Sequence, residues 1–338
     1  MTFGVRSIGR VTGTIESVQA AAPRYTADPR KVGEWGYRWF YLAEDGIGLT
    51  DLAESAGRAA LDRAGLTAND VDLLVFATAE LPEYLYWDPA AACQGRLGAR
   101  RAEAVLATQA CSAGVAAFDI VAGKFATHPE YRVALLIGSH RVCETYRNRM
   151  ESDTSVSSDG AAAAVLLRDH AACRWLATEV ISDGRFADLV KLPGGGAARP
   201  FSPLQQDVGV LPNPFDGLVE AFAGDGRTMI EYSRLVWANS VEVIDRACKR
   251  ASVRREDIRY VLHVNENQKS LARLSDQIGL PMAATNAEIA ADHGHFGSAD
   301  QIFALGVLLD DGRVRSGDLV ALTSTGNGMH WACTLLRG

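Results

Sequence analysis

The stretch Thr108–Gly123 reads TQACSAGVAAFDIVAG, and it is the most informative segment of the chain. It places Cys111 immediately before a helix made mostly of small and apolar residues. A helix that is apolar on every side is buried all round, and small side chains let neighbouring elements approach closely. The apolar segment Ala104–Ala107 precedes it. The pattern therefore predicts a buried strand, a turn that carries Cys111 and a core helix.

A second copy of this pattern occurs later in the chain. Asp62–Thr78 (DRAGLTANDVDLLVFAT) matches Lys249–Asn265 (KRASVRREDIRYVLHVN) at an offset of 187 residues, and the same offset pairs the apolar runs 133–135 and 320–322. Each copy has a helix end, a short polar turn with an acidic residue, and a continuous apolar run typical of a strand covered on both faces. Matches in one register predict two halves of the same topology.

In this register Cys111 falls opposite Ser298, where SADQIFALGVLLDDG opens a second apolar helix. Two buried helix N-termini are thus expected near one centre. Strands that alternate with helices indicate α/β layering. We divide the chain into an N-terminal half, 1–175, which carries the cysteine, and a C-terminal half, 176–338. Between the repeated segments, Lys191–Gly217 is rich in proline and glycine and reads either as a plain linker or as a lid or acceptor-binding loop.

Composition limits the class of protein. The 338 residues are 48% hydrophobic and 22% charged with a net charge of −7, which favours a folded chain and disfavours nucleic acid as a partner. No stretch approaches the roughly 20 apolar residues of a membrane span, and residues 1–13 do not form a signal peptide. None of the six cysteines forms a CxxC, so we expect free thiols, no metal site and a cytoplasmic location without membrane contact.

Cys111 is the candidate nucleophile. Unpaired N–H groups and the helix dipole at a helix N-terminus stabilise a thiolate, and the cysteine's own N–H can bind an oxyanion. A buried, inert thiol is the usual role of a free cysteine and is the interpretation of the other five. His263 at the end of an apolar strand and His295 in a glycine-flanked loop each read, in isolation, as structural histidines.

Five motifs appear in a shared order: ACSAG at 110–114, SDGAAAAVL at 158–166, HVN at 263–265, HGHFGSAD at 293–300, and a glycine-rich turn at 326–331. Together they resemble the ketoacyl-acyl-carrier-protein synthase III family along nearly the whole chain. The resemblance implies a duplicated thiolase fold with five layers, α/β/α/β/α, and a homodimer. It also implies a tunnel for a phosphopantetheine thioester of an acyl carrier protein or coenzyme A, with no permanently bound cofactor.

The resemblance assigns site residues. Cys111, His263 and the position of His295, where the family has asparagine, would form the catalytic set. The N–H groups of Cys111 and Asn327 would hold the oxyanion. Asn265 is a candidate for support, and Asp300 either stabilises the helix start or orients a histidine. Further expected substrate contacts are Arg38, Trp87, Gly326 and Gly328.

Departures from the family matter for the substrate. The segment that helps to bind coenzyme A is replaced by Trp35–Tyr41, where only Arg38 persists, so a carrier-protein donor gains support. Glu80–Asp88 corresponds to a dimer-contact loop, from which Trp87 or Asp88 would reach the partner's tunnel; a simple exposed aromatic loop is the alternative.

These departures resemble a branch found in secondary-metabolite pathways. We expect Cys111 to accept an acyl group and pass it to the hydroxyl or amine of a small-molecule acceptor, with His263 or His295 as the base. Decarboxylative condensation with a malonyl carrier protein is the alternative. A non-catalytic partner subunit and an unrelated cysteine hydrolase are the remaining hypotheses.

Overall fold

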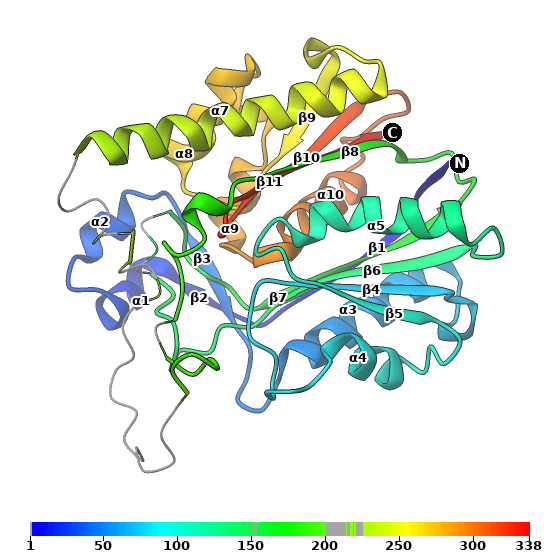
Figure 1. Ribbon diagram of the computed structural model, residues 1–338, viewed down its shortest axis with the longest axis horizontal. Coiled ribbons are helices and arrows are strands. Elements are labelled where there is room, and N and C mark those ends of the chain that lie inside the picture. Colours follow the sequence, from blue (N-terminus) through cyan, green and yellow to red (C-terminus); the bar gives the residue numbers. More distant parts are fainter. Residues whose placement is uncertain are drawn as a thin grey trace.

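The computed structural model describes residues 2–150, 152, 154–192, 194–200, 214, 217, 218, 220 and 226–338. Two stacked sheets enclose a pair of central helices, and further helices cover the outer face of each sheet (Figure 1). The two sheets are one continuous set of nine strands, in the order β5-β4-β6-β7-β1-β8-β11-β10-β9.

The first sheet is built from the N-terminal part of the chain. β4 runs parallel to both β5 and β6, whereas β7 is antiparallel to β6 and to β1. Its central strands are entirely buried because helices cover both faces, which explains their continuous apolar sequences. The strands are β1 (Phe3–Thr12), β4 (Leu73–Thr78), β5 (Glu103–Ala107), β6 (Val133–His140) and β7 (Gly160–Arg168).

The second sheet repeats the first. β9 is parallel to β10, and β11 is antiparallel to β10 and to β8. At the position that corresponds to β5 of the first sheet, the second sheet has a single parallel β-bridge between Val261 and Thr285. The two sheets join where Gly4 pairs with Arg174. The strands are β8 (Arg174–Ser182), β9 (Ile258–Leu262), β10 (Leu319–Gly326) and β11 (His330–Arg337).

The helices complete five layers. α3 (Leu49–Ala64) and α4 (Pro89–Leu97) pack on the first sheet, and α7 (Gly226–Ala251) packs on the second. Between the sheets, α5 (Ala113–Thr127) contacts strands of both sheets, and α10 (Asp300–Asp310) contacts β1, β7 and β9. Figure 1 shows this α/β/α/β/α stacking. The predicted duplicated thiolase fold is confirmed.

The smaller elements lie at the end of the molecule near α7's first turns (Figure 1). β2 (Thr14–Ser17) and β3 (Trp39–Leu42) form a two-stranded sheet, and α9 packs on β3. The remaining helices are α1 (Val18–Tyr25), α2 (Pro29–Gly33), α8 (Gln268–Ile278) and α9 (Ala287–His293).

Glycines allow the central layer to close. A Cβ added to Gly114, in the first turn of α5, would lie 2.0 Å from the backbone oxygen of Ser298. One added to Gly138 in β6 would lie 2.7 Å from Cα of Ala299. The starts of the two related helices therefore meet backbone to backbone, as expected from the repeat.

The segment Ala110–Thr127 has the length and apolar composition of a membrane span, although no such span was expected. In the fold this segment is α5, which lies between the two sheets with most of its first turns buried. Its apolar composition is therefore explained by its place in the core of the fold.

Two predicted boundaries concern the join between the halves. The division at residue 175 falls just inside β8 and stays a prediction. In Lys191–Gly217, residues 193, 201–213, 215 and 216 lie outside the described part of the chain. Lys191, Leu192 and Pro214 of this segment line the cavity that contains Cys111, which is described below.

Candidate active site

The nucleophile loop connects β5 to α5. Ala110 adopts a positive φ of 47°, a conformation that costs a non-glycine residue on the order of 1 kcal/mol. Side chains hold the loop on both sides: the hydroxyl of Ser112 donates to the carbonyl of Gln109 (2.6 Å), and that of Ser324 donates to the carbonyl of Cys111 (2.9 Å). The strained turn thereby presents the partly exposed Cys111 at the start of α5.

Cys111, His295 and Asp300 form a continuous chain of contacts. The Sγ atom of Cys111 lies 3.3 Å from Nε2 of His295, and Nδ1 of the same ring lies 2.5 Å from Oδ2 of Asp300. A nucleophile, a base and a carboxylate that orients the base are thus in line. Because Nδ1 faces a carboxylate, this nitrogen carries the proton, and Nε2 is the atom that exchanges a proton with sulfur.

The charges around His295 favour the protonated form of its imidazole. Burial on its own would lower the pKa of His295, but the Asp300 carboxylate and the Cys111 sulfur outweigh burial and raise that pKa well above its usual range. An imidazolium next to sulfur stabilises the thiolate, which is the reactive form of cysteine.

Asp300 is held by backbone donors. Its Oδ1 accepts from the N–H of Phe296 (2.6 Å) and its Oδ2 from the N–H of Asn265 (2.7 Å). The Asn265 side chain donates to the carbonyl of Gly294 (2.6 Å) and accepts from Asn286 (2.7 Å). The backbone N–H of Asn265 thus holds the carboxylate that approaches His295, and the two roles considered for Asp300 stay predictions.

His263 occupies a different environment. Its Nδ1 lies 2.9 Å from the hydroxyl of Thr323, and its backbone N–H donates to Asn286 (2.8 Å). Burial lowers the pKa of His263 to about 4, and the carboxylate of Asp300 offsets this only in part. His263 is therefore a neutral imidazole at pH 7, and its side chain faces the same cavity as Cys111.

A cavity of about 760 Å³ contains the reactive groups and is lined mostly by apolar surface. Cys111, His263 and His295 all line it. Asn327 and Gly328 of the late turn also line it, as expected for groups near the thioester. Gly326 instead packs against the nucleophile loop, where a Cβ would lie 2.7 Å from the Ser112 hydroxyl.

Like Gly326, the expected substrate contacts Arg38 and Trp87 lie outside the cavity lining. Arg38 forms ion pairs with Glu288 (2.9 Å) and Asp292 (2.5 Å) of α9. Trp87 packs edge-on against Tyr84 in an exposed segment, and Asp88 caps α4 by accepting from the N–H groups of its first turn. Their roles in binding the donor or in reaching a partner's tunnel stay predictions.

Sequence reasoning did not assign three titratable residues near the nucleophile. The ring of His140, at the end of β6, lies 5.6 Å from the ring of His295, and its Nε2 lies 2.9 Å from Oε1 of Glu80. Burial alone would raise the pKa of Glu80, but Arg147 and His140 lower it to about 2. The third residue is Glu266, three residues after His263, which lines the cavity.

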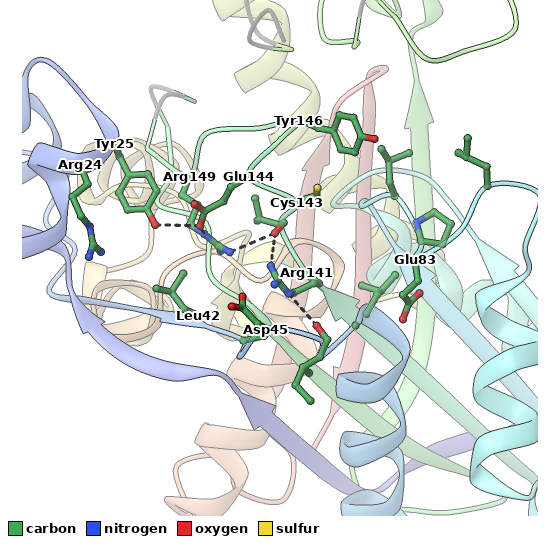
Figure 2. Close-up of a pocket in the computed structure, with 18 residues that line it drawn as sticks. Arg24, Tyr25, Leu42, Asp45, Glu83, Arg141, Cys143, Glu144, Tyr146 and Arg149 are labelled. Atoms are coloured by element: carbon green, nitrogen blue, oxygen red, sulfur yellow. Dashed lines mark hydrogen bonds and ion pairs between the residues drawn. The ribbon is translucent and has the colours of Figure 1, made fainter. Parts of the chain in front are cut away.

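A second, more open cavity has a volume of about 920 Å³. Figure 2 shows the residues that line it. Charged residues that line this cavity include Arg141, Glu144 and Arg149. Cys111, His295 and Asp300 are not among its lining residues. It shares Leu81, Arg141, Cys143 and Tyr146 with the first cavity and borders it.

A cysteine at the start of a buried helix, paired with a carboxylate-backed histidine in a duplicated α/β fold, defines an acyl-transferring enzyme of the thiolase fold. The sequence agrees with this class. Residues 107–184 match the family described as 3-oxoacyl-[acyl-carrier-protein] synthase III, and residues 248–338 match its C-terminal domain. The chain is 30% identical to a synthase III from Synechocystis sp. over 92% of this chain and 90% of that protein. The chain belongs to the ketoacyl-acyl-carrier-protein synthase III family.

Solved structures agree. A synthase III from Pseudomonas aeruginosa superposes with a TM-score of 0.80 at 25% identity, over 100% of this chain and 98% of that one. The acyltransferase ChlB3 gives a TM-score of 0.86 at 23% identity, over 100% and 98% of the two chains, and AbyA1, described as a tetronic acid condensing enzyme, gives 0.79 at 23% over 99% and 100%. The protein is thus a transferase of this family, whose members act on acyl thioesters of carrier protein or coenzyme A.

Proposed function

We propose that the protein loads an acyl group onto Cys111 and transfers it to a hydroxyl or amine of a small molecule in natural-product, polyketide-type biosynthesis. The contact that carries the proposal is the 2.5 Å approach of Asp300 to His295. A family asparagine at position 295 could donate or accept hydrogen bonds but could not act as a base, whereas an imidazole backed by a carboxylate can take a proton from an acceptor.

The proposed reaction has two steps. The thiolate of Cys111 attacks the thioester carbonyl, the bond from the acyl carbon to the carrier sulfur breaks, and His295 gives its proton to the departing thiolate. Neutral His295 then takes the proton of the acceptor O–H or N–H as that atom bonds to the acyl carbon. Cleavage of the bond to Cys111 restores the thiolate–imidazolium pair. The N–H groups of Cys111 and Asn327 are proposed to hold the oxyanion in both steps.

Decarboxylative condensation is the second candidate, and the neutral state of His263 favours it. With its Nδ1 next to Thr323, a neutral imidazole can present an Nε2–H to the enolate that forms when a malonyl thioester loses carbon dioxide. Both reactions share the acylation of Cys111, and they differ in what the second substrate contributes.

Further features support three parts of the proposal: a homodimer, a carrier-protein donor and a cytoplasmic location. Leu85 and Tyr86 are exposed apolar side chains in the segment expected to contact a second copy, which supports a homodimer. The two carboxylates that hold Arg38 leave little positive charge for the phosphates of coenzyme A, which supports a carrier-protein donor. Six free thiols suit a cytoplasmic enzyme.

Intact-protein mass spectrometry tests the proposal. The protein and Cys111→Ala are incubated with malonyl and simple acyl thioesters, and hydroxyl or amine acceptors are then added. A mass increase that requires Cys111 and is discharged by an acceptor into an ester or amide is the expected result. Release of carbon dioxide with a β-keto thioester product would replace acyl transfer by condensation, and no adduct from any thioester would leave a non-catalytic partner subunit.

A further inference from the structure

Glu266 is an acidic residue inside the cavity that the two-step mechanism does not use. It follows β9, and a tight turn in which its N–H donates to the carbonyl of Val264 (2.6 Å) fixes its direction. The next residue is tied down as well, because the N–H of Asn267 donates to the carbonyl of Thr154 (2.8 Å). The backbone thus holds Glu266 in the wall that also contains Cys111 and His295.

The carboxyl of Glu266 has no cationic partner among the described residues. Burial raises its pKa to about 7, and the other groups that influence it are Ser270, His295 and Asp300. The described cations that line the same cavity are engaged elsewhere: Lys191 pairs with Asp188, Arg147 with Glu80, and Arg141 with backbone carbonyls and Asp159. By contrast, Glu80 has two such partners, Arg147 and His140.

A carboxylate that is removed from water without a cation is costly, and a ligand that supplies the cation removes that cost. Glu266 is partly buried in the wall of the cavity, so it favours the binding of a positively charged group that arrives with a substrate. The hydroxyl of Ser270 acts in the opposite direction to burial and lowers the pKa of Glu266.

We propose that Glu266 is the recognition residue for an acceptor that carries an ammonium group, and that it binds this group by an ion pair while a second heteroatom of the acceptor attacks the acyl-Cys111 thioester. The inference rests on the proposed acyl transfer and adds the class of acceptor: an amino alcohol or another hydroxyl compound with a cationic amine.

Two acceptors of equal length separate recognition from nucleophilicity. 3-Aminopropan-1-ol carries an ammonium and a hydroxyl at pH 8, and propane-1,3-diol carries two hydroxyls. Binding of each probe to the full-length enzyme is followed by NMR titration, and discharge of acyl-Cys111 is followed by mass spectrometry and normalised to the acylated fraction. The variants are Glu266→Gln, which removes the charge at constant shape, Glu266→Asp, which retains it, and the surface control Glu242→Gln.

The expected result is that the wild-type protein binds the amino alcohol at least tenfold more tightly than the diol. Glu266→Gln should abolish this preference, Glu266→Asp should retain part of it, and Glu242→Gln should leave it intact. Equal binding of the two probes by the wild type, or a preference that survives in Glu266→Gln, would overturn the inference. Binding that depends on Glu266 without discharge of acyl-Cys111 by either probe would instead count against acyl transfer and leave the cation site standing.

Discussion

Nδ1 of His295 lies 2.5 Å from Oδ2 of Asp300, five residues further along the chain. Because of this contact, the two histidines that line the cavity, His295 and His263, have different charge states. The pKa of His295 is raised because carboxylate and sulfur flank the ring, whereas burial lowers the pKa of His263 to about 4. One histidine is thus the charged partner of the thiolate, and the other is neutral across the physiological range.

The first prediction concerns a variant that lacks the carboxylate of Asp300. In Asp300→Asn the pKa of His295 should fall, because an opposite charge at hydrogen-bond distance is lost. With less imidazolium next to the Cys111 sulfur, alkylation of Cys111 by iodoacetamide should slow by about tenfold or more. Peptide mass spectrometry separates this adduct from one on the exposed Cys143.

Asp311→Asn, at the exposed end of α10, is the matched control and should alkylate at the wild-type rate. A thermal melt of each variant shows whether the fold persists, since Asp300 also accepts two backbone hydrogen bonds. Equal rates for Asp300→Asn and the wild type across pH 5–9 would show that the carboxylate does not govern the thiolate.

The second prediction concerns stability in acid. The pKa of His263 is about 4 in the folded protein and about 6.5 in an unfolded chain, so the unfolded state binds more protons between these values. Stability from this group is complete above pH 6.5 and is lost as the pH falls towards 4, by up to about 3 kcal/mol. Urea unfolding at pH 7 and pH 4.5 should therefore show a smaller acid loss in His263→Gln than in the wild type.

His128→Gln, which changes a partly exposed histidine, is the control. This variant should lose as much stability in acid as the wild type. Glu266 acts in the opposite direction, since its pKa of about 7 in the folded state makes stability fall as the pH rises from 4.5 to 7. Glu266 is present in both proteins, so its contribution cancels when His263→Gln is compared with the wild type. An unchanged pH dependence in His263→Gln would mean that this imidazole is not buried in its neutral form.

Much of the fold is readable from the sequence, because it follows from hydrophobic pattern and internal repetition. The offset that pairs Cys111 with Ser298 correctly brings the starts of α5 and α10 together, and Gly114 is the residue that permits their contact. Periodicity and helix N-terminus chemistry depend on neighbours in the chain, so they can be read without the structure.

The charge state of the site could not be read in this way. Whether Asp300 caps a helix or orients His295 depends on the loop that folds the ring back over the helix start. The role of Glu266 depends on a turn at Val264 that sets its direction. Such contacts are decided by backbone geometry and by distant residues such as Thr323, and no local pattern encodes them.

The third prediction tests a buried ion pair beneath the second cavity. The guanidinium of Arg149 makes two 2.9 Å contacts with the carboxylate of Asp159, and both side chains are almost completely buried. Arg149→Met leaves the buried Asp159 with Arg141, at 3.4 Å, as its remaining cationic partner, so this variant should lower the free energy of unfolding by about 3 kcal/mol. Denaturant titration measures it.

Arg246→Met is the control, because its pair with Glu242 is half exposed and worth less than about 1 kcal/mol. The double variant Arg149→Met with Asp159→Leu should recover part of the lost stability, since both fully buried charges of the pair are then removed. A loss in Arg149→Met no larger than that in Arg246→Met would contradict the assignment of a desolvated pair.

The fourth prediction compares two glycines of one helix. An alanine Cβ at Gly114 would meet the backbone oxygen of Ser298 at 2.0 Å, whereas one at Gly123 would meet no atom within 4 Å. Gly123→Ala should therefore raise the free energy of unfolding by about 0.5–1 kcal/mol through helix propensity. Gly114→Ala should lower it by about 1–3 kcal/mol, because backbone must shift in a packed core. Gly114→Ala should also slow alkylation of Cys111, since the displaced α10 start carries Asp300. Equal stability of the two variants in denaturant titration would show that the two helix starts are not in backbone contact.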